Sequence, residues 1–240
     1  MLEVNGLESG YGEITVLREI NIKVGNDEIV CLIGSNGSGK TTLLKTIAGL
    51  LKPIKGEIIF NGQRIDGISP SRICELGIVY VPGAMEVFPR MTILENLLVS
   101  SMTKRAKEKR AETLKMVCEI FPVLEERKKQ LAKTLSGGER QMLAIARGLM
   151  TQPKLMMLDE PSAGLMPRVT ALIYEKLLEI RETFGVSVLL VEQDVLNALK
   201  VSNRGYILEN GQIIYEGNST TLMRDEKLMR AYLGLEGVNL

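Results

Sequence analysis

Apolar residues along this chain recur with two different spacings, one typical of strands and one typical of helices. Runs of strand length bounded by turn residues predict strands; they lie at Leu2–Gly6, Ile20–Val24, Ile29–Ile33, Ile78–Val81, Leu155–Leu158 and Val186–Val191. Two Asn-Gly pairs, at 61–62 and 210–211, predict hairpins with type I′ turns that join 56–60 to 63–65 and 206–209 to 212–215. The chain therefore combines antiparallel ribbons with buried strands.

Between Met91 and Met150, apolar residues recur at helical spacing, and no run has a convincing strand pattern. We expect helices at Ile93–Val99, Ala106–Phe121 and Glu139–Met150, forming a helical insert at about 90–150. An amphipathic helix is also predicted between the last two buried strands, from the apolar positions Val169, Leu172, Ile173, Leu177 and Ile180. A strand–helix–strand order implies parallel pairing with a right-handed crossover. Because 240 residues can bury a full core in one domain, or in one domain with a small appended lobe, we expect a single α/β domain over residues 1–240.

Residues 34–42, GSNGSGKTT, follow a predicted strand and precede a helix-like run. They fit the phosphate-binding pattern G-x-x-x-x-G-K-[ST] in the setting that this pattern requires. Glycines let backbone N–H groups curl inward around an anion, and the following helix points its positive end there. Lys40 is expected to reach the β- and γ-phosphates, and the Thr41 hydroxyl to ligate Mg²⁺. The predicted nucleotide-binding residues of this loop are Gly34, Ser35, Asn36, Gly37, Ser38, Gly39, Lys40, Thr41 and Thr42.

An apolar run that ends in two adjacent carboxylates, Asp159 and Glu160, is the second chemical signal. The carboxyl ends of strands form the ligand-binding edge of an α/β sheet, so both side chains are expected beside the phosphate loop. Asp159 suits the surroundings of Mg²⁺, and Glu160 suits the polarisation of an attacking water. Such a strand exit is commonplace by itself, but after a phosphate loop it indicates phosphoryl chemistry.

A second candidate anion site is the run Leu135-Ser136-Gly137-Gly138-Glu139, which opens a predicted helix. Ser136 can cap this helix, the two glycines leave backbone N–H groups uncovered, and a helix N-terminus attracts anions. Because the phosphate loop already holds the phosphates of one nucleotide, the second site is expected to serve a different copy.

Composition excludes several kinds of chemistry. The chain contains no histidine, which excludes His-ligated metals, Ser–His triads and imidazole acid–base steps. Lys+Arg number 30 against Asp+Glu 29, so nucleic-acid binding driven by net charge is not expected. The three cysteines lie far apart, as is typical of reduced thiols in a cytosolic protein. No run approaches the roughly 18 apolar residues of a membrane-spanning helix.

In their order along the chain, GSNGSGKTT, LSGGE and LMMLDEP resemble the motifs of the ATP-binding cassette (ABC) ATPases. The resemblance covers essentially the whole chain and implies a P-loop NTPase fold. That fold has a RecA-like core sheet, an N-terminal antiparallel β subdomain and an inserted α-helical subdomain. The implied cofactors are ATP and Mg²⁺, with Thr41 and Asp159 at the metal and, as catalytic residues, Lys40, Glu160 and Gln193.

Subunit pairing in that family assigns the remaining site residues. Two subunits pair head to tail, and ATP is held between the phosphate loop of one and the signature of the other. Ser136–Glu139 would therefore complete the site of a partner, which is either a second copy or a paralogous ATP-binding subunit. Tyr11 matches the aromatic residue that stacks on adenine in the family. Gln193 stands where a switch histidine is usual and remains a neutral hydrogen-bond partner for the γ-phosphate.

Less specific sequence similarities indicate one branch of this family, the ATP-binding subunits of branched-chain amino acid importers. They are YVP and VFP at 80–82 and 87–89, LVEQ at 190–193 and AYLG at 231–234. The branch implies dimer closure coupled to transport, transmembrane permease subunits, a substrate-binding protein acting indirectly, and no nucleic acid. It places the chain peripherally on the cytoplasmic face of the membrane. The chain departs from the branch at Gly83, where glutamine or glutamate is usual, and Glu86 is the candidate substitute.

Other functions remain open at this point. Relatives in the branch serve urea and short amides. A soluble cassette ATPase acting on nucleic acid or ribosomes is opposed by the near-neutral charge and the lack of long insertions. A GTPase or small-molecule kinase would leave LSGGE unexplained and would lack its N-K-x-D guanine-reading motif. Gly83 also raises the possibility of a nucleotide-sensing regulator that hardly hydrolyses ATP.

Overall fold

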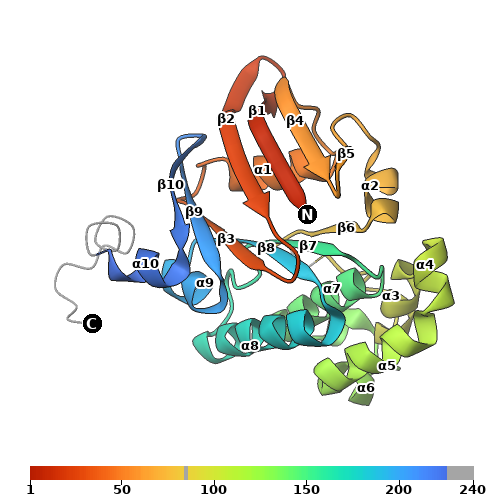
Figure 1. Cartoon of the computed structure of the whole chain (residues 1–240). Coiled ribbons are helices and arrows are strands. Elements are labelled where there is room, and N and C mark those ends of the chain that lie inside the picture. The colour runs from red at the N-terminus through yellow and green to blue at the C-terminus, as the bar shows by residue number, and fades with distance from the viewer. Residues whose placement is uncertain (84–85, 226–240) are drawn as a thin grey trace.

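Six strands form the larger of two sheets in the computed structural model, which describes residues 1–83 and 86–225 (Figure 1). They are β3 (Ile29–Ile33), β6 (Ile78–Val81), β7 (Leu155–Asp159), β8 (Ser187–Glu192), β9 (Arg204–Glu209) and β10 (Gln212–Asn218). Their order in the sheet is β10-β9-β3-β8-β7-β6, and only the β9–β10 hairpin is antiparallel. The predicted parallel pairing of the buried strands is confirmed.

A smaller, antiparallel sheet is formed by the N-terminal part of the chain. Its strands are β1 (Leu2–Tyr11), β2 (Ile14–Val24), β4 (Lys55–Phe60) and β5 (Gln63–Arg64), in the order β2-β1-β4-β5. The predictions for β1 and β2 were too short, because Tyr11 pairs with Ile14 across a tight turn that the sequence pattern did not indicate. Register shifts along β1 interrupt the alternation of apolar and polar residues on which the prediction depended.

The parallel sheet is covered on both faces. On one face lie the antiparallel sheet and α1 (Lys40–Ile47); on the other lie α7 (Gly137–Leu149), α8 (Pro167–Phe184) and α9 (Val195–Val201) (Figure 1). Two hydrophobic clusters result, and successive residues of β3 alternate between them, with Cys31 in one and Leu32 in the other. Every residue of β3, β7 and β8 is buried, as expected for parallel strands covered on both sides.

Short helices make up most of the segment between β6 and α7. They are α3 (Ile93–Ser100), α4 (Lys104–Glu108), α5 (Arg110–Ile120), α6 (Pro122–Glu126) and a 3-10 turn at Ala132–Thr134. The prediction of one helix over Ala106–Phe121 is wrong, because the chain turns at Lys109 between α4 and α5. The Arg110 guanidinium anchors that turn through bonds to the Ser101 hydroxyl at 2.7 Å and the Ser101 carbonyl at 3.1 Å.

Four short helices of the described residues have no counterpart in the sequence predictions: α2 (Pro70–Leu76), α6, α9 and α10 (Ser219–Arg224). In α8 the predicted apolar face is largely right, since Ile173, Leu177 and Ile180 are fully buried, but Leu172 is 36% exposed on its flank. Among residues 1–83 and 86–225, no helix has the length and apolar character needed to cross a membrane. The AYLG run at 231–234 lies outside the described residues.

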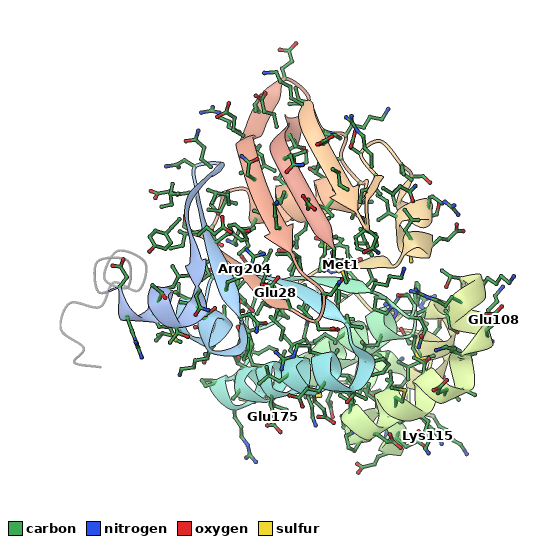
Figure 2. The ribbon with its side chains drawn as sticks, viewed as in Figure 1. Met1, Glu28, Glu108, Lys115, Glu175 and Arg204 are labelled. Carbon is green, nitrogen blue, oxygen red and sulfur yellow. The ribbon has the colours of Figure 1, made fainter. Side chains whose placement is uncertain are left out.

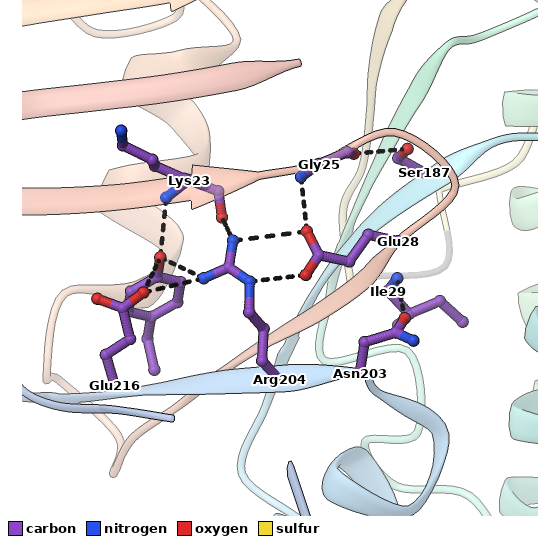
Figure 3. Close-up of polar contacts among 9 residues, drawn as sticks. Lys23, Gly25, Glu28, Ile29, Ser187, Asn203, Arg204 and Glu216 are labelled. Carbon is purple, nitrogen blue, oxygen red and sulfur yellow. Dashed lines mark hydrogen bonds and ion pairs between the residues drawn. The ribbon is translucent and has the colours of Figure 1, made fainter. Parts of the chain in front are cut away.

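An ionic network joins the two sheets (Figure 3). Nε of Arg204, on β9, donates to Oε1 of Glu28 at 2.6 Å, and its Nη2 donates to the backbone carbonyl of Lys23 on β2. Glu28 Oε2 accepts from the Gly25 amide at 2.6 Å. Figure 2 shows Arg204 and Glu28 between the sheets, whereas Glu175 on α8 points outward.

Candidate functional site

The loop that joins β3 to α1 has the backbone shape of an anion-binding nest. Gly37 and Gly39 have φ angles of +81° and +112°, in the left-handed region that favours glycine. α1 begins at Lys40 without a side-chain cap, so its first N–H groups remain available to a ligand. A Cβ on Gly34 would lie 2.5 Å from the Leu208 carbonyl oxygen, so this glycine is needed for packing. The predicted phosphate loop therefore has the conformation expected of it.

Lys40 is buried at the base of this loop and has three acceptors around its ammonium group. Nζ donates to the carbonyl oxygens of Gly34 at 2.7 Å and Ser35 at 2.9 Å, and lies 3.1 Å from Glu160 Oε1. An ammonium has three hydrogens; two are donated to these carbonyls, and the Glu160 carboxylate is an ion-pair partner of the same group. A phosphate that approaches Lys40 would compete with the Glu160 carboxylate for the ammonium group.

Glu160 is held toward Lys40 by a left-handed backbone. Its φ is +49°, which is uncommon for a residue with a side chain, and its amide donates to the Val191 carbonyl at 2.8 Å. Such conformations persist only where the surrounding structure imposes them, and they concentrate at functional sites. The geometry supports a specific role for the Glu160 carboxylate.

Asp159, at the end of β7, is hydrogen-bonded through both carboxylate oxygens. The Thr41 hydroxyl donates to Oδ1 at 3.1 Å, and the Tyr80 hydroxyl donates to Oδ2 at 2.9 Å. Burial, with the adjacent Asp159 charge, raises the pKa of Tyr80, so its hydroxyl is a donor at neutral pH. Tyr80 was not predicted as a site residue, because its contact with Asp159 depends on how β6 pairs with β7.

The hard oxygen atoms of Thr41 and Asp159 fit Mg²⁺. This ion is usually held by one or two carboxylates together with water and substrate phosphates. The described residues contain no cluster of three or more His, Cys, Asp or Glu side chains that could hold a metal ion. Thr41 and Asp159 would hold Mg²⁺ only in company with a phosphate ligand.

An open cleft of about 1030 Å³ connects these groups. Its walls include eight of the predicted residues: Asn36, Gly37, Gly39, Lys40, Thr41, Thr42, Asp159 and Glu160. Val16, Tyr80 and Glu86 also line it, although sequence reasoning assigned none of them to nucleotide. Glu86, the candidate substitute for the side chain missing at Gly83, therefore lies at the cleft.

Nine predicted residues are not among the walls of this cleft: Gly34, Ser35 and Ser38 of the loop itself, Tyr11, Gln193, and the run Ser136–Glu139. Tyr11 is 46% exposed at the end of β1, and it is Val16 of β2 that reaches the cleft from this sheet. Gln193 lines a neighbouring hollow of about 310 Å³ together with Glu160 and Ser162. Its place next to Glu160 is compatible with a role at the γ-phosphate.

The run Ser136–Glu139 forms the start of α7. Ser136 Oγ accepts from the Glu139 amide at 3.3 Å, and Glu139 Oε2 accepts from the Ser136 amide at 2.8 Å, a reciprocal capping box. Burial acts to raise the pKa of Glu139, but bonds from Ser136 and the guanidinium of Arg127 outweigh it and leave the pKa lowered. Glu139 thus stays ionised and fixes the loop before the helix.

The two glycines of this run have different surroundings. A Cβ on Gly138 would lie 2.4 Å from Val169 Cγ1, so glycine is required for α7 to approach α8. A Cβ on Gly137 would meet only Leu165 Cδ2, at 3.6 Å. Neither glycine, nor Ser136 or Glu139, lines the cleft at the phosphate loop. One chain therefore keeps the two candidate anion sites apart.

Comparison with known proteins agrees with this arrangement. Residues 17–163 match the family model "ABC transporter". The chain is 42% identical over 234 residues to the Pseudomonas aeruginosa protein "High-affinity branched-chain amino acid transport ATP-binding protein BraG", covering 98% of this chain and 100% of that protein.

Solved structures with the same fold include two ATP-binding cassettes. A nucleotide-free cassette from an ABC transporter has a TM-score of 0.84 and 28% identity, covering 98% of this chain and 99% of its own. A dimeric cassette in a post-hydrolysis state, bound to ADP and Pi, has a TM-score of 0.78 and 25% identity, covering 91% and 99%. The chain belongs to the ABC transporter family, and it is an ATP-hydrolysing ATP-binding cassette of that family.

Proposed function

We propose that this cassette is the motor of an importer for branched-chain or other hydrophobic amino acids. The observation that carries the catalytic part is the convergence of Lys40, Asp159 and Glu160 on one cleft beside the phosphate loop. The cargo rests on the relative BraG, whose name refers to branched-chain amino acid transport. The chain would lie peripherally on the cytoplasmic face of the membrane, against permease subunits served by a substrate-binding protein.

Each side chain of the cleft has a role that follows from its chemistry. The loop amides and Lys40 bind the β- and γ-phosphates, and Lys40 exchanges its contact with Glu160 for a phosphate oxygen. Mg²⁺ held by Thr41 and Asp159 would supply neutralisation of phosphate charge. Glu160, once released, orients a water molecule in line with the γ-phosphate and accepts its proton. Gln193 donates a hydrogen bond to the γ-phosphate, and Tyr11 stacks on adenine.

The second half of each site comes from another subunit. Ser136, Gly137, Gly138 and Glu139 lie on a helix start that does not reach the cleft of its own chain. A helix N-terminus attracts phosphate, so these residues would contact the nucleotide of a partner. The partner is a second copy or a paralogous ATP-binding subunit. ATP binding would then close the dimer, and hydrolysis would reopen it and drive the permease.

The variant Glu160→Gln tests this proposal. Loss of the general base is expected to lower ATP turnover at least about a hundredfold while ATP binding is retained. ATP should then accumulate in a closed dimer, detectable by light scattering. Glu175→Gln is the matched control, because Glu175 is exposed on the outer face of α8. An unchanged turnover in Glu160→Gln would refute the role of Glu160.

The same variant also tests the partners. When Glu160→Gln is purified from native membranes with ATP, the closed complex is expected to retain its permease subunits. In the wild-type complex, adding a binding protein loaded with leucine should stimulate ATP hydrolysis. Stimulation by a urea-loaded binding protein instead would indicate the amide branch. Recovery of nucleic acid without any permease would refute a transport role.

A further inference from the structure

The carboxylate of Asp159 has a donor on each oxygen, although only Thr41 belongs to a recognised motif. Asp159 is 6% exposed, so water cannot readily replace either donor. Thr41 comes from α1 and Tyr80 from β6, two different elements that both precede β7 in the sequence. An unpaired carboxylate oxygen at this burial would be unfavourable. The second donor, Tyr80, therefore contributes to the position of the carboxylate.

The position of Tyr80 follows from the pairing of β6 with β7. The two strands are parallel, with Tyr80 opposite Met157, two residues before Asp159. Side chains alternate along a strand, so Tyr80, Met157 and Asp159 point to the same face of the sheet, which is the face that carries α1. The Tyr80 ring also lines the cleft, so it lies between the strand and the nucleotide site.

The chain after Tyr80 closes over the same aspartate. A Cβ on Gly83 would lie only 2.4 Å from the backbone carbonyl oxygen of Asp159, so the backbone at 83 packs directly against it. The segment 80–83 thus contacts Asp159 at its carboxylate through Tyr80 and at its backbone through Gly83. A side chain at 83 is not available for the metal site, and the Tyr80 hydroxyl is the polar group that this segment directs to it.

We propose that Tyr80 is a positioning residue for the metal site, and that its hydroxyl holds the Asp159 carboxylate in the rotamer that presents Oδ1 to Thr41. The proposal rests on the assignment of Thr41 and Asp159 to Mg²⁺ under the proposed function. The terminal torsion of an aspartate has a broad minimum, so one hydrogen bond leaves the carboxylate free to turn, whereas two fix it. Removing the hydroxyl lowers the fraction of protein with the competent rotamer and weakens metal affinity by that fraction.

The test measures binding of a fluorescent ATP analogue as a function of Mg²⁺ concentration, with no need for turnover. In Tyr80→Phe the Mg²⁺ concentration for half-maximal binding is expected to rise about tenfold, the lower end of the effect of outer partners on metal sites. Binding of the analogue in excess chelator should stay unchanged, because Tyr80 acts through Asp159 and not on the nucleotide.

Tyr206→Phe is the matched control. Its hydroxyl donates to the Glu216 carboxylate at 2.9 Å, the same length as the bond from Tyr80 to Asp159, but within the network between the sheets. This variant is expected to lose stability without changing the Mg²⁺ requirement. An equal shift in Tyr206→Phe would mean that the effect is one of general stability, which would overturn the role of Tyr80.

Asp159→Asn separates this inference from the function on which it rests. A Mg²⁺ requirement that is unchanged in Asp159→Asn would refute the metal site itself. A large shift in Asp159→Asn with none in Tyr80→Phe would leave the metal site standing and refute the positioning role alone. Shifts in both, larger for Asp159→Asn, are the expected result.

Discussion

At the residue scale, Gly83 lies where the backbone of Asp159 leaves no space for a side chain. The family resemblance indicates only that a glutamine or glutamate is absent there. In the structure a Cβ at this position would lie 2.4 Å from the Asp159 carbonyl oxygen. This is a steric clash, and backbone atoms would have to move to relieve it. Restoring the expected side chain would therefore displace the strand end that carries Asp159.

We accordingly expect Gly83→Ala to destabilise the protein by about 1–3 kcal/mol, the usual range for overpacking, and to weaken ATP binding. Gly217→Ala is a suitable control, since its closest neighbour is the movable ring edge of Tyr215 at 3.2 Å. Urea unfolding and nucleotide titration measure both effects. Full stability and affinity in Gly83→Ala would show that the loop at 83 adapts without displacing Asp159.

Residues of the site could be predicted from the sequence where the chemistry is local to one segment. Lys40 and Thr41 belong to a motif whose spacing alone specifies a phosphate loop, and Glu160 follows its strand directly. Tyr80 could not be found this way. Its contact with Asp159 joins residues 79 positions apart and depends on which strand lies next to β7.

At the element scale, the end of β8 supports the loop that follows Glu160. Glu192, its last residue, is 2% exposed and accepts hydrogen bonds from the backbone amides of Ser162 and Gln193, each at 3.2 Å. Burial raises the pKa of Glu192. The backbone hydrogen bonds and those from the Ser162 and Tyr174 side chains lower it, but they do not offset the effect of burial. Ionisation of Glu192 at neutral pH is therefore unfavourable to the fold.

The sign of the resulting pH dependence is determined by that shift. Because the folded pKa exceeds the unfolded value of about 4.3, the contribution of Glu192 is fully present below pH 4.3 and is lost as pH rises through the folded pKa. The free energy of unfolding of Glu192→Gln, relative to wild type, should thus increase between pH 4 and pH 7. Urea unfolding across this range measures it, with Glu175→Gln as the exposed control. A constant difference, or one that moves the other way, would contradict the prediction.

Helices could be predicted where apolar residues recur at helical spacing over several turns or where a capping residue marks the helix start. α7 has Ser136 as its cap, and α8 has three fully buried positions at helical spacing. The break between α4 and α5 at Lys109 has no such signal, since it depends on contacts of Arg110 with Ser101. The same limit applies to α2 and α9, which are too short to show a period.

At the scale of the whole molecule, the antiparallel sheet must keep a fixed position over the core, because Val16 from β2 lines the ATP cleft. Arg204 provides one link, with bonds to Glu28 and to the Lys23 carbonyl and a further bond of 2.6 Å to the Tyr206 hydroxyl (Figure 3). The side chains of Arg204 and Glu28 are 23% and 18% exposed, so the pair is only partly screened by water. Removing one partner of such a pair costs more than it does in a surface pair, because the other charge is left partly buried without its partner.

Arg204→Met keeps the aliphatic stem but leaves Glu28 and the Lys23 carbonyl without this donor, and we expect a loss of about 2 kcal/mol in unfolding free energy. A double-mutant cycle with Glu28→Gln should give a coupling energy of about 1 kcal/mol or more, as found for residues in one network. The exposed pair Arg72–Glu75, with side chains 60% and 52% exposed, is the control and should give about 0.5 kcal/mol or less. A coupling as small at Arg204–Glu28 would mean that this ion pair contributes no more to stability than a surface pair.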